Sequence, residues 1–211
     1  MQNIDATYNA SKNPFTPIEA GLYPAHITGI SSREVKVKGS PAVVFNFTYR
    51  IADEAKKLTQ VVYEMDGYKY IRDNNGSRVP IKNGDGGMKT IKCTHLVGKE
   101  FTDKGTFLFT GDEGSGRNRG YLQVCETLGV KLNTKTVDGE EITSLGLLEH
   151  EDAVGKPVLV KLGQEEFVTK ETRGLPKDQQ ETRKVWKVFT KMTWSEGNIL
   201  SADEVTEDVP F

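Results

Sequence analysis

Alternating apolar and polar positions predict that this chain is built mainly from β-strands. The clearest alternation runs from Val43 to Ile51, where Phe45, Phe47 and Tyr49 occupy every second position between polar residues. Because neighbouring side chains of a strand point to opposite faces, these rings are expected to lie in a core. Further strands are expected over residues 21–30, 58–65, 68–72, 107–109, 156–162 and 183–193.

A helix is expected between the third and the fourth main strand. Tyr121, Val124 and Leu128 lie on one face of a helix over residues 117–128, and Gly129 supplies a C-terminal stop. A Greek-key β-barrel of the OB-fold type has one helix at this place, so the order of elements predicts a mainly β fold of that type with minor α content. An antiparallel α+β sandwich is the alternative architecture.

Composition divides the chain into three parts. Residues 1–13 are polar and are expected to be a flexible N-terminal arm, and residues 14–194 are expected to form the OB-like domain. That domain contains an inserted loop region around residues 66–110, with a Gly- and Asn-rich stretch over residues 73–90. Residues 195–211 form an acidic tail with few large apolar side chains, which predicts disorder in the free protein.

The formal charge of −2 conceals an uneven distribution of charge along the chain. Residues 196–211 contain five acidic residues and no Lys or Arg, so the rest of the chain has 28 basic and 25 acidic residues, a net charge of +3. The sequence therefore predicts a mildly basic body and an acidic tail.

The end of the tail differs from the rest of it. Phe211 carries an aromatic ring together with the terminal carboxylate, and Pro210 fixes the backbone just before it, which lowers the entropy lost on docking. The acidic residues upstream favour a basic rim around an apolar pocket of a partner. The residues expected to bind partner proteins are Glu207, Asp208, Val209, Pro210 and Phe211.

This ending resembles the acidic C-terminal tip of bacterial single-stranded-DNA-binding proteins, which closes in Asp-Ile-Pro-Phe. Here Asp208-Val209-Pro210-Phe211 matches that tip, with Val209 in place of Ile. The resemblance covers at most about 16 residues, and the tip stands at the extreme end of the chain. It implies that Asp208, Pro210 and Phe211 contact proteins of DNA replication and recombination.

The body resembles phage-encoded single-stranded-DNA-binding proteins of recombination and replication cassettes. The resemblance rests on Asn13-Pro14-Phe15, Gly21-Leu22-Tyr23, the helix over residues 117–129, Gly155–Val160 and the basic final hairpin. The body is longer than that of the bacterial proteins and contains the Gly-rich insertion at residues 73–90. The resemblance implies an OB-fold that binds single-stranded DNA, in the cytoplasm of the host if the chain is phage-encoded.

Binding single strands without sequence preference needs cations along the phosphate path and flat faces for the bases. The cations expected to contact phosphate are Lys36, Lys38, Lys69, Arg72, Lys170, Arg173, Lys177, Arg183, Lys184 and Lys187; Arg33, Arg78, Arg117 and Arg119 are further basic positions. Tyr68, Tyr70 and Trp186 are expected to stack on bases, the alternative being that their rings cover the core. In an OB barrel the loop after the first strand and the loop between the last two strands flank one groove, so Lys36, Lys38 and the cations of residues 170–187 are expected to converge.

Other chemistry is poorly supported by the sequence. Met88 interrupts the glycine run before Lys89-Thr90 that a phosphate loop would need. Cys93-Thr94-His95 offers two ligand types for zinc without a second pair at suitable spacing, and Cys93 and Cys125 are expected to be reduced thiols in a cytosol. No run approaches the 18 apolar residues of a membrane span.

The expected function is therefore non-catalytic, sequence-tolerant binding of single-stranded DNA, with no cofactor, metal or membrane partner. Two alternatives remain open. One is a β-rich structural or adaptor protein, such as a phage virion component, which would have a neutral face in place of a basic groove. The other is an enzyme acting on nucleic acid, which would need a cluster of carboxylates or a metal site. The oligomeric state is left open.

Overall fold

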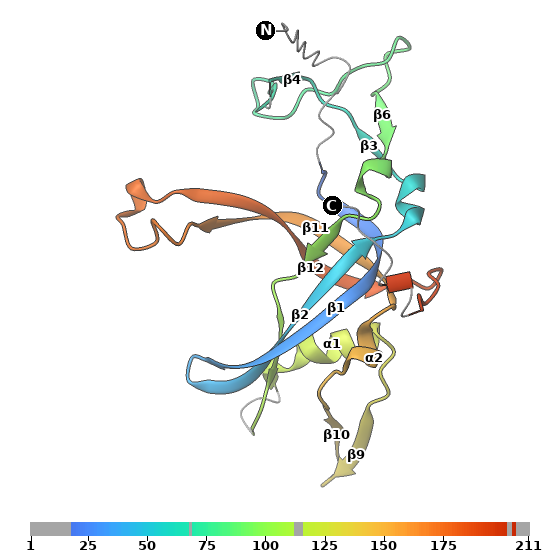
Figure 1. Ribbon diagram of the computed structural model, residues 1–211, viewed down its shortest axis with the longest axis vertical. Helices are drawn as coiled ribbons and strands as arrows, with labels where there is room; N and C mark the ends of the chain where they lie inside the picture. The colour runs from blue at the N-terminus through green and yellow to red at the C-terminus, as the bar shows by residue number, and fades with distance from the viewer. Residues whose placement is uncertain (1–17, 68, 112–115, 202–203, 206–211) are drawn as a thin grey trace, which may run out of the picture. The chain divides into compact units, whose positions relative to one another are not determined.

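The chain folds into two compact units, described here by a computed structural model over residues 18–67, 69–111, 116–201 and 204–205 (Figure 1). One unit comprises Met1–Glu19 and Lys56–His95, as far as these are described, and is called the smaller unit. The other comprises Ala20–Ala55 and Leu96–Phe211 and is called the larger unit. The boundary falls inside the sequence predicted to be one domain. Of the insertion expected around residues 66–110, residues 66–95 belong to the smaller unit and residues 96–110 to the larger unit.

The larger unit is organised around a six-stranded antiparallel sheet in the order β12-β11-β1-β2-β7, in which β8 also pairs with β2. Its strands are β1 (Gly21–Val37), β2 (Ser40–Ile51), β7 (Glu100–Thr102), β8 (Thr106–Phe109), β11 (Pro157–Val168) and β12 (Thr182–Thr193). β7 pairs with the second half of β2 and β8 with the first half. The chain turns between them at Gly105, whose φ of +89° suits glycine. The prediction of a mainly β fold is confirmed.

The two ends of this sheet approach each other at one point. A single parallel bridge joins Asp103, in the β7–β8 connection, to Val188 of β12. Elsewhere among the described strands, the hydrogen-bonded ladders run from β12 to β7 and β8 without closing into a barrel. Apart from this bridge, the contacts between β12 and the β7–β8 connection described below are made by side chains.

The core of the larger unit follows the alternation in β2 and β11. Phe45, Phe47 and Tyr49 are at most 1% exposed, which confirms their prediction as core residues. Val158 and Val160 of β11 are also fully buried. Burying each large apolar side chain contributes about 1.5–3 kcal/mol, so these two strands supply much of the driving force for folding.

A helix follows the β8 strand, as the apolar spacing predicts. α1 (Arg119–Thr127) buries Tyr121, Val124 and Cys125, and the Tyr121 ring lies 5.2 Å from that of Phe45. The helix is followed by Gly129, whose φ is +64°. A short second helix, α2 (His150–Ala153), begins with a capping box formed by Glu149 and Asp152. No helix of the described residues is long and apolar enough to cross a membrane.

One hairpin of the larger unit was not predicted. β9 (Asn133–Val137) and β10 (Glu140–Ser144) pair in a region where no strand was expected. Their residues are largely exposed and polar, so no apolar alternation marks them. The local signal is the turn: Asp138 and Gly139 both have positive φ, 52° and 84°, as a tight Asp-Gly hairpin requires.

The smaller unit consists of short β segments and tight turns. β3 (Thr59–Val61) pairs with β6 (Thr90–Lys92). β4 (Met65–Asp66) pairs with β5 (Lys69–Tyr70) across a turn between the strands expected over residues 58–65 and 68–72. Isolated bridges join Tyr63 to Pro80, Arg72 to Arg78 and Lys82 to Met88. Two 3₁₀ helices, η1 (Asp53–Lys57) and η2 (Cys93–Leu96), lie at its boundaries in the sequence. The region expected to be a loop around residues 66–110 is therefore largely folded.

Candidate nucleic-acid interface

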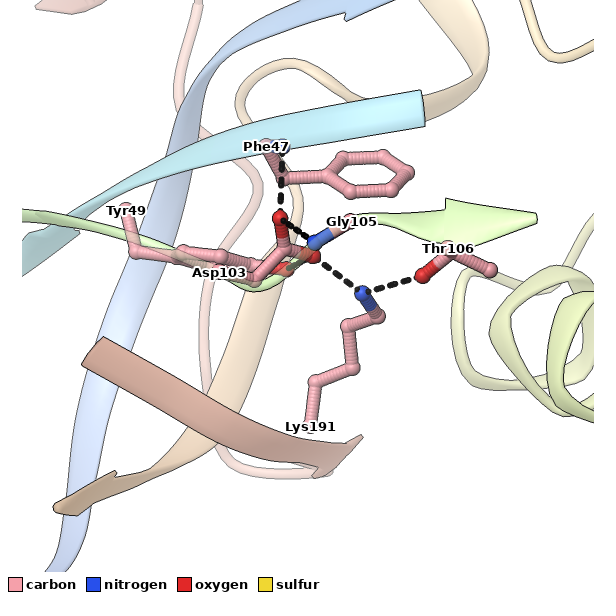
Figure 2. Close-up of polar contacts among 6 residues, drawn as sticks. All are labelled: Phe47, Tyr49, Asp103, Gly105, Thr106 and Lys191. Atoms are coloured by element: carbon pink, nitrogen blue, oxygen red, sulfur yellow. Dashed lines mark hydrogen bonds and ion pairs between the residues drawn. The ribbon is translucent and has the colours of Figure 1, made fainter. Parts of the chain in front are cut away.

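A buried ion pair lies where β12 meets the β7–β8 connection of the larger unit (Figure 2). The Nζ atom of Lys191 lies 2.7 Å from Oδ2 of Asp103, and the two side chains are only 10% and 6% exposed. Oδ1 of Asp103 accepts hydrogen bonds from the backbone N–H groups of Phe47, at 3.2 Å, and Gly105, at 3.1 Å. The Tyr49 hydroxyl donates to Oδ2 at 3.3 Å. One carboxylate therefore links β2, β12 and the connection before β8.

The electrostatics of this cluster depend on burial. Desolvation lowers the pKa of Lys191, while the charge of Asp103 opposes that shift. The ammonium also donates to Oγ1 of Thr106 at 3.1 Å and lies 4.4 Å from the centre of the Phe47 ring. Burial, followed by the charge of Asp103, raises the pKa of Tyr49, so its hydroxyl remains a donor. These contacts fix the β7–β8 connection against β12.

The same connection forms one wall of a pocket of about 360 Å³. Its other walls come from β8, β12 and the first turns of α1. The aromatic and cationic residues in its lining are Lys104, Phe107, Phe109, Arg117, Phe189 and Lys191. The pocket therefore combines rings and cations from segments more than 80 residues apart in the sequence.

Two of the rings project from β8. Phe107 is 37% exposed and Phe109 half-buried, whereas Leu108 between them is 5% exposed. This alternation follows from the strand geometry, which sends Leu108 to the core and both phenylalanines outward. The two ring centres are 6.2 Å apart and their planes are tilted by 27°. The guanidinium carbon of Arg117 lies 3.7 Å from the centre of the Phe109 ring.

The third ring, Phe189, is placed by an irregularity in β12. Lys161 pairs with Thr190 and Leu162 with Val188, so Phe189 is the extra residue of a β-bulge. Phe189 follows the buried Val188 and is 44% exposed, as strand alternation requires, and the bulge adjusts the direction of its side chain.

Gly163 makes room for this ring. A Cβ atom at Gly163 would lie only 2.8 Å from Cε2 of Phe189, so a larger residue would displace the ring. Lys104 places its Nζ 4.2 Å from the ring centre and also pairs with Glu165 at 2.8 Å. Phe189 is therefore positioned by β11 and by the β7–β8 connection, and it remains 44% exposed.

Sequence reasoning did not single out Lys104, Phe107, Phe109 or Phe189 as binding residues. For Arg117 the sequence indicates only a basic position. The signal within the sequence was the alternation Phe107-Leu108-Phe109, which predicts two rings on one strand face. Nothing local indicates that Phe189 joins them, because its position depends on the bulge and on a contact with Gly163, 26 residues earlier.

Eight of the ten cations predicted to contact phosphate lie on two hairpins of the larger unit. Lys38 is exposed at the turn between β1 and β2, whereas Lys36 is exposed within β1, which continues to Val37 instead of ending at the loop expected after residue 30. The β11–β12 hairpin carries Lys170, Arg173, Lys177, Arg183, Lys184 and Lys187, with a 3₁₀ turn, η4 (Lys177–Gln179), in its loop. Figure 1 shows both hairpins projecting toward the same side of the larger unit, with their tips apart. Their convergence on one DNA groove stays a prediction.

Two of the predicted hairpin side chains are less exposed than the rest. Lys187 is half-buried, and its Nζ donates a hydrogen bond to Oγ1 of Thr102 in β7. Trp186 is half-buried and pairs with Gln164 of β11. Neither side chain is enclosed in the core.

The remaining predicted residues fall elsewhere. Lys69, Tyr70 and Arg72 belong to the smaller unit. Tyr70 is half-buried, with its ring 4.2 Å from the Arg78 guanidinium. Tyr68 and the tip residues Glu207, Asp208, Val209, Pro210 and Phe211 lie outside the described residues.

Two further features bear on chemistry. Cys93 and Cys125 are buried free thiols, and burial raises the pKa of both. In the described ranges, no group of three or more His, Cys, Asp and Glu side chains is placed to hold a metal ion. Comparison with protein-family models, with curated proteins and with solved structures finds no match to this chain.

Proposed function

We propose that this chain is a non-catalytic protein that binds single-stranded DNA in replication or recombination. The observation that carries the proposal is the pocket of the larger unit, where Phe107, Phe109 and Phe189 lie next to Lys104 and Arg117. Sequence-tolerant binding of single strands needs this combination, because every base has a flat face and every nucleotide has a phosphate. Neither feature requires a particular sequence of bases.

The strand order supports an OB-like reading of the larger unit. β1, β2, the β7–β8 pair, β11 and β12 would be the five strands, with α1 between the third and the fourth. The bridge between Asp103 and Val188 would mark the point where the barrel closes. In OB-folds the second and third strands and two neighbouring loops bind oligonucleotides. Here Phe107 and Phe109 stand on the third strand, and the two loops are the basic hairpins.

The contacts divide into two kinds. The rings of Phe107 and Phe189 would stack on bases, each stacked base contributing about 1–3 kcal/mol. Lys104, Arg117 and the cations of the hairpins would neutralise phosphates and so make the affinity fall with salt. The guanidinium of Arg117, already held over Phe109, offers a flat cationic surface of its own.

The acidic end of the chain has a separate role in this proposal. Glu207–Phe211 would dock on proteins of replication or recombination, with Phe211 in an apolar pocket and the acidic residues facing a basic rim. That role rests on the sequence resemblance of the tip.

The proposal is tested by fluorescence anisotropy with a labelled single-stranded oligonucleotide of mixed sequence and with its duplex. We expect micromolar or tighter binding of the single strand at low salt and weaker binding of the duplex, whose bases cannot reach the rings. Failure to bind the single strand at micromolar concentrations and low salt would overturn it and favour a β-rich structural or adaptor protein.

A further inference from the structure

One face of the smaller unit gathers both aromatic and cationic side chains. Directly paired residues of antiparallel strands place their side chains on the same face. The side chains of each bridged pair therefore lie on the same face; the pairs are Tyr63 and Pro80, Arg72 and Arg78, and Lys82 and Met88. Since residues 78, 80 and 82 alternate along one segment, these pairs share a single face. This set of side chains, together with Tyr70, is called the Arg78 face.

Arg78 lies at the centre of this face. Its guanidinium carbon is 4.2 Å from the centre of the Tyr70 ring and 5.5 Å from that of Tyr63. The two rings meet edge to face with their centres 5.8 Å apart. A planar cation next to two tyrosine rings is a suitable surface for stacking bases.

A carboxylate of the chain itself is seated on this surface. Nη1 of Arg78 lies 2.7 Å from Oε1 and 2.8 Å from Oε2 of Glu19, and the Tyr70 hydroxyl donates to Oε1 at 3.4 Å. Burial and the charge of Glu19 raise the pKa of Tyr70 to about 12, so the hydroxyl remains a donor at neutral pH. Arginine binds carboxylate and phosphate oxygens in the same way, so Glu19 occupies a place suited to a phosphate.

The smaller unit also carries the basic surplus of the chain. Lys56–His95 contains eight Lys and Arg against four Asp and Glu. The larger unit without residues 196–211 has 19 basic and 19 acidic residues, so it is electrically balanced. The net charge of +3 predicted for the body therefore comes from the smaller unit.

The pairing of Arg72 with Arg78 is a second feature of this face that favours an anion. Like charges placed directly opposite each other on neighbouring strands are destabilising. Glu19 offsets the charge of Arg78, whereas Arg72 is exposed and its guanidinium donates to the backbone oxygen of Gly76. A bound anion would relieve the repulsion between the two arginines.

From these observations we infer that the Arg78 face is a second surface for the phosphodiester backbone of single-stranded DNA, and that Glu19 occupies it until a phosphate displaces the carboxylate. The inference rests on the proposed function and extends it to a unit outside the OB-like fold. Tyr63 and Tyr70 favour a nucleic acid over an acidic peptide, because their rings can stack on bases beside the cation. Glu19 then acts as an internal competitor that lowers the affinity for DNA.

The test compares Glu19→Gln with Glu64→Gln in the full chain, by titration with a single-stranded oligonucleotide. Glu64 is an exposed neighbour of Tyr63 and points to the opposite face, so both variants remove one negative charge from the same unit. Glu19→Gln removes a partly exposed ion pair and frees Arg78, so this variant should bind the oligonucleotide about two- to fivefold more tightly than wild type. Glu64→Gln should change the affinity by less. Equal affinities of Glu19→Gln and wild type would overturn the inference.

A second pair of variants tests the Arg78 face without changing the contacts among Glu19, Tyr70 and Arg78. Arg72→Gln should weaken binding and lower the salt slope by about one unit, because one phosphate contact is lost. Lys89→Gln removes the same charge from the opposite face and should leave the slope closer to that of wild type. Equal effects of the two substitutions on DNA binding would overturn the inference. It would also be overturned if Glu19→Gln raised the affinity for an acidic peptide but not the affinity for single-stranded DNA.

The two proposals fail in different ways. If wild type binds no single strand, the proposed function fails and the inference with it. If Phe189→Ala weakens binding while Glu19→Gln and Arg72→Gln behave like wild type, only the Arg78 face is excluded.

Discussion

Nζ of Lys191 lies 2.7 Å from Oδ2 of Asp103, and this contact links β12 to the β7–β8 connection at the point where only one backbone bridge joins them. The pair is buried, and its carboxylate also accepts two backbone N–H groups. It therefore holds in place the segment that carries Lys104 into the pocket.

Removing one partner of this pair should destabilise the fold strongly. Lys191→Ala leaves the Asp103 carboxylate buried without its counterion, which typically costs about 3–5 kcal/mol. The exposed pair of Lys104 and Glu165 is the matched control, and Lys104→Ala should cost at most about 1 kcal/mol. Urea unfolding measures both. Equal losses in the two variants would contradict a clamping role for Lys191.

Gly163 should control DNA binding through Phe189. A methyl group at Gly163 would meet the Phe189 ring at 2.8 Å, so Gly163→Ala should move the ring and weaken single-strand binding about fivefold or more. Gly146→Ala is the control, since a Cβ there meets nothing within 4 Å. In a double-mutant cycle, Gly163→Ala should add little to Phe189→Ala. Additive losses would show that Gly163 acts by another route.

The acidic tip should be separable from DNA binding. Deleting Glu207–Phe211 removes two acidic residues and no cation, so the affinity for single-stranded DNA should stay the same or rise. Capture of replication or recombination proteins by the immobilised chain should be lost. A loss of DNA affinity in the deletion variant, measured by the same titration, would contradict this division of labour.

Stability should fall as the pH rises above about 9. Burial raises the pKa of Cys93, Cys125, Tyr49 and Tyr121, so these groups keep their protons in the folded chain and lose them in the unfolded chain near pH 9 for Cys and 10 for Tyr. The unfolded state then binds fewer protons, and each group lowers the free energy of unfolding by up to about 1.4 kcal/mol per pH unit. Lys191 acts in the opposite direction, because its pKa is lowered in the folded chain. Below about pH 10.5 the unfolded chain keeps this proton more readily than the folded chain, so this group raises the free energy of unfolding as the pH rises.

One variant tests how much Tyr121 contributes to the fall in the free energy of unfolding at high pH. Tyr121→Phe should make the fall between pH 10 and 11 shallower, because its buried hydroxyl no longer titrates on unfolding. Urea unfolding at several pH values gives the slope. An unchanged slope would show that Tyr121 does not contribute.

Periodicity predicted the parts of the fold whose residues are buried in a regular pattern. β2 and α1 were found because Phe45, Phe47 and Tyr49, and then Tyr121 and Val124, repeat with the spacing of a strand and a helix. β3, β4 and β5 fall within the strands expected over residues 58–65 and 68–72 or next to them. The β9–β10 hairpin, β6 and the bridged segments over residues 78–88 were not predicted, because they are short and mostly exposed. Local pattern carries little information about such strands, whose pairing depends on turns and on cross-strand contacts.

The candidate site was less accessible to sequence reasoning. Clusters of Lys and Arg identified the two hairpins, but the sequence did not reveal that residues 56–95, which carry the basic surplus, belong to a separate unit. The pocket depends on Lys104 reaching Phe189 and on Asp103 reaching Lys191, pairs that lie 85 and 88 residues apart. Such contacts follow from the order of strands in the sheet and from the bulge in β12, neither of which is visible locally.

The most direct measurement is a titration of wild type, Phe189→Ala and Leu147→Ala with one mixed-sequence oligonucleotide at two salt concentrations. Leu147 is an exposed apolar residue that does not line the pocket, so its substitution controls for lost apolar surface. We predict that wild type and Leu147→Ala bind alike and lose affinity with salt, while Phe189→Ala binds about 5- to 100-fold more weakly with the same salt slope. Absence of binding by wild type at low salt, or equal affinities of Phe189→Ala and wild type, would contradict the account.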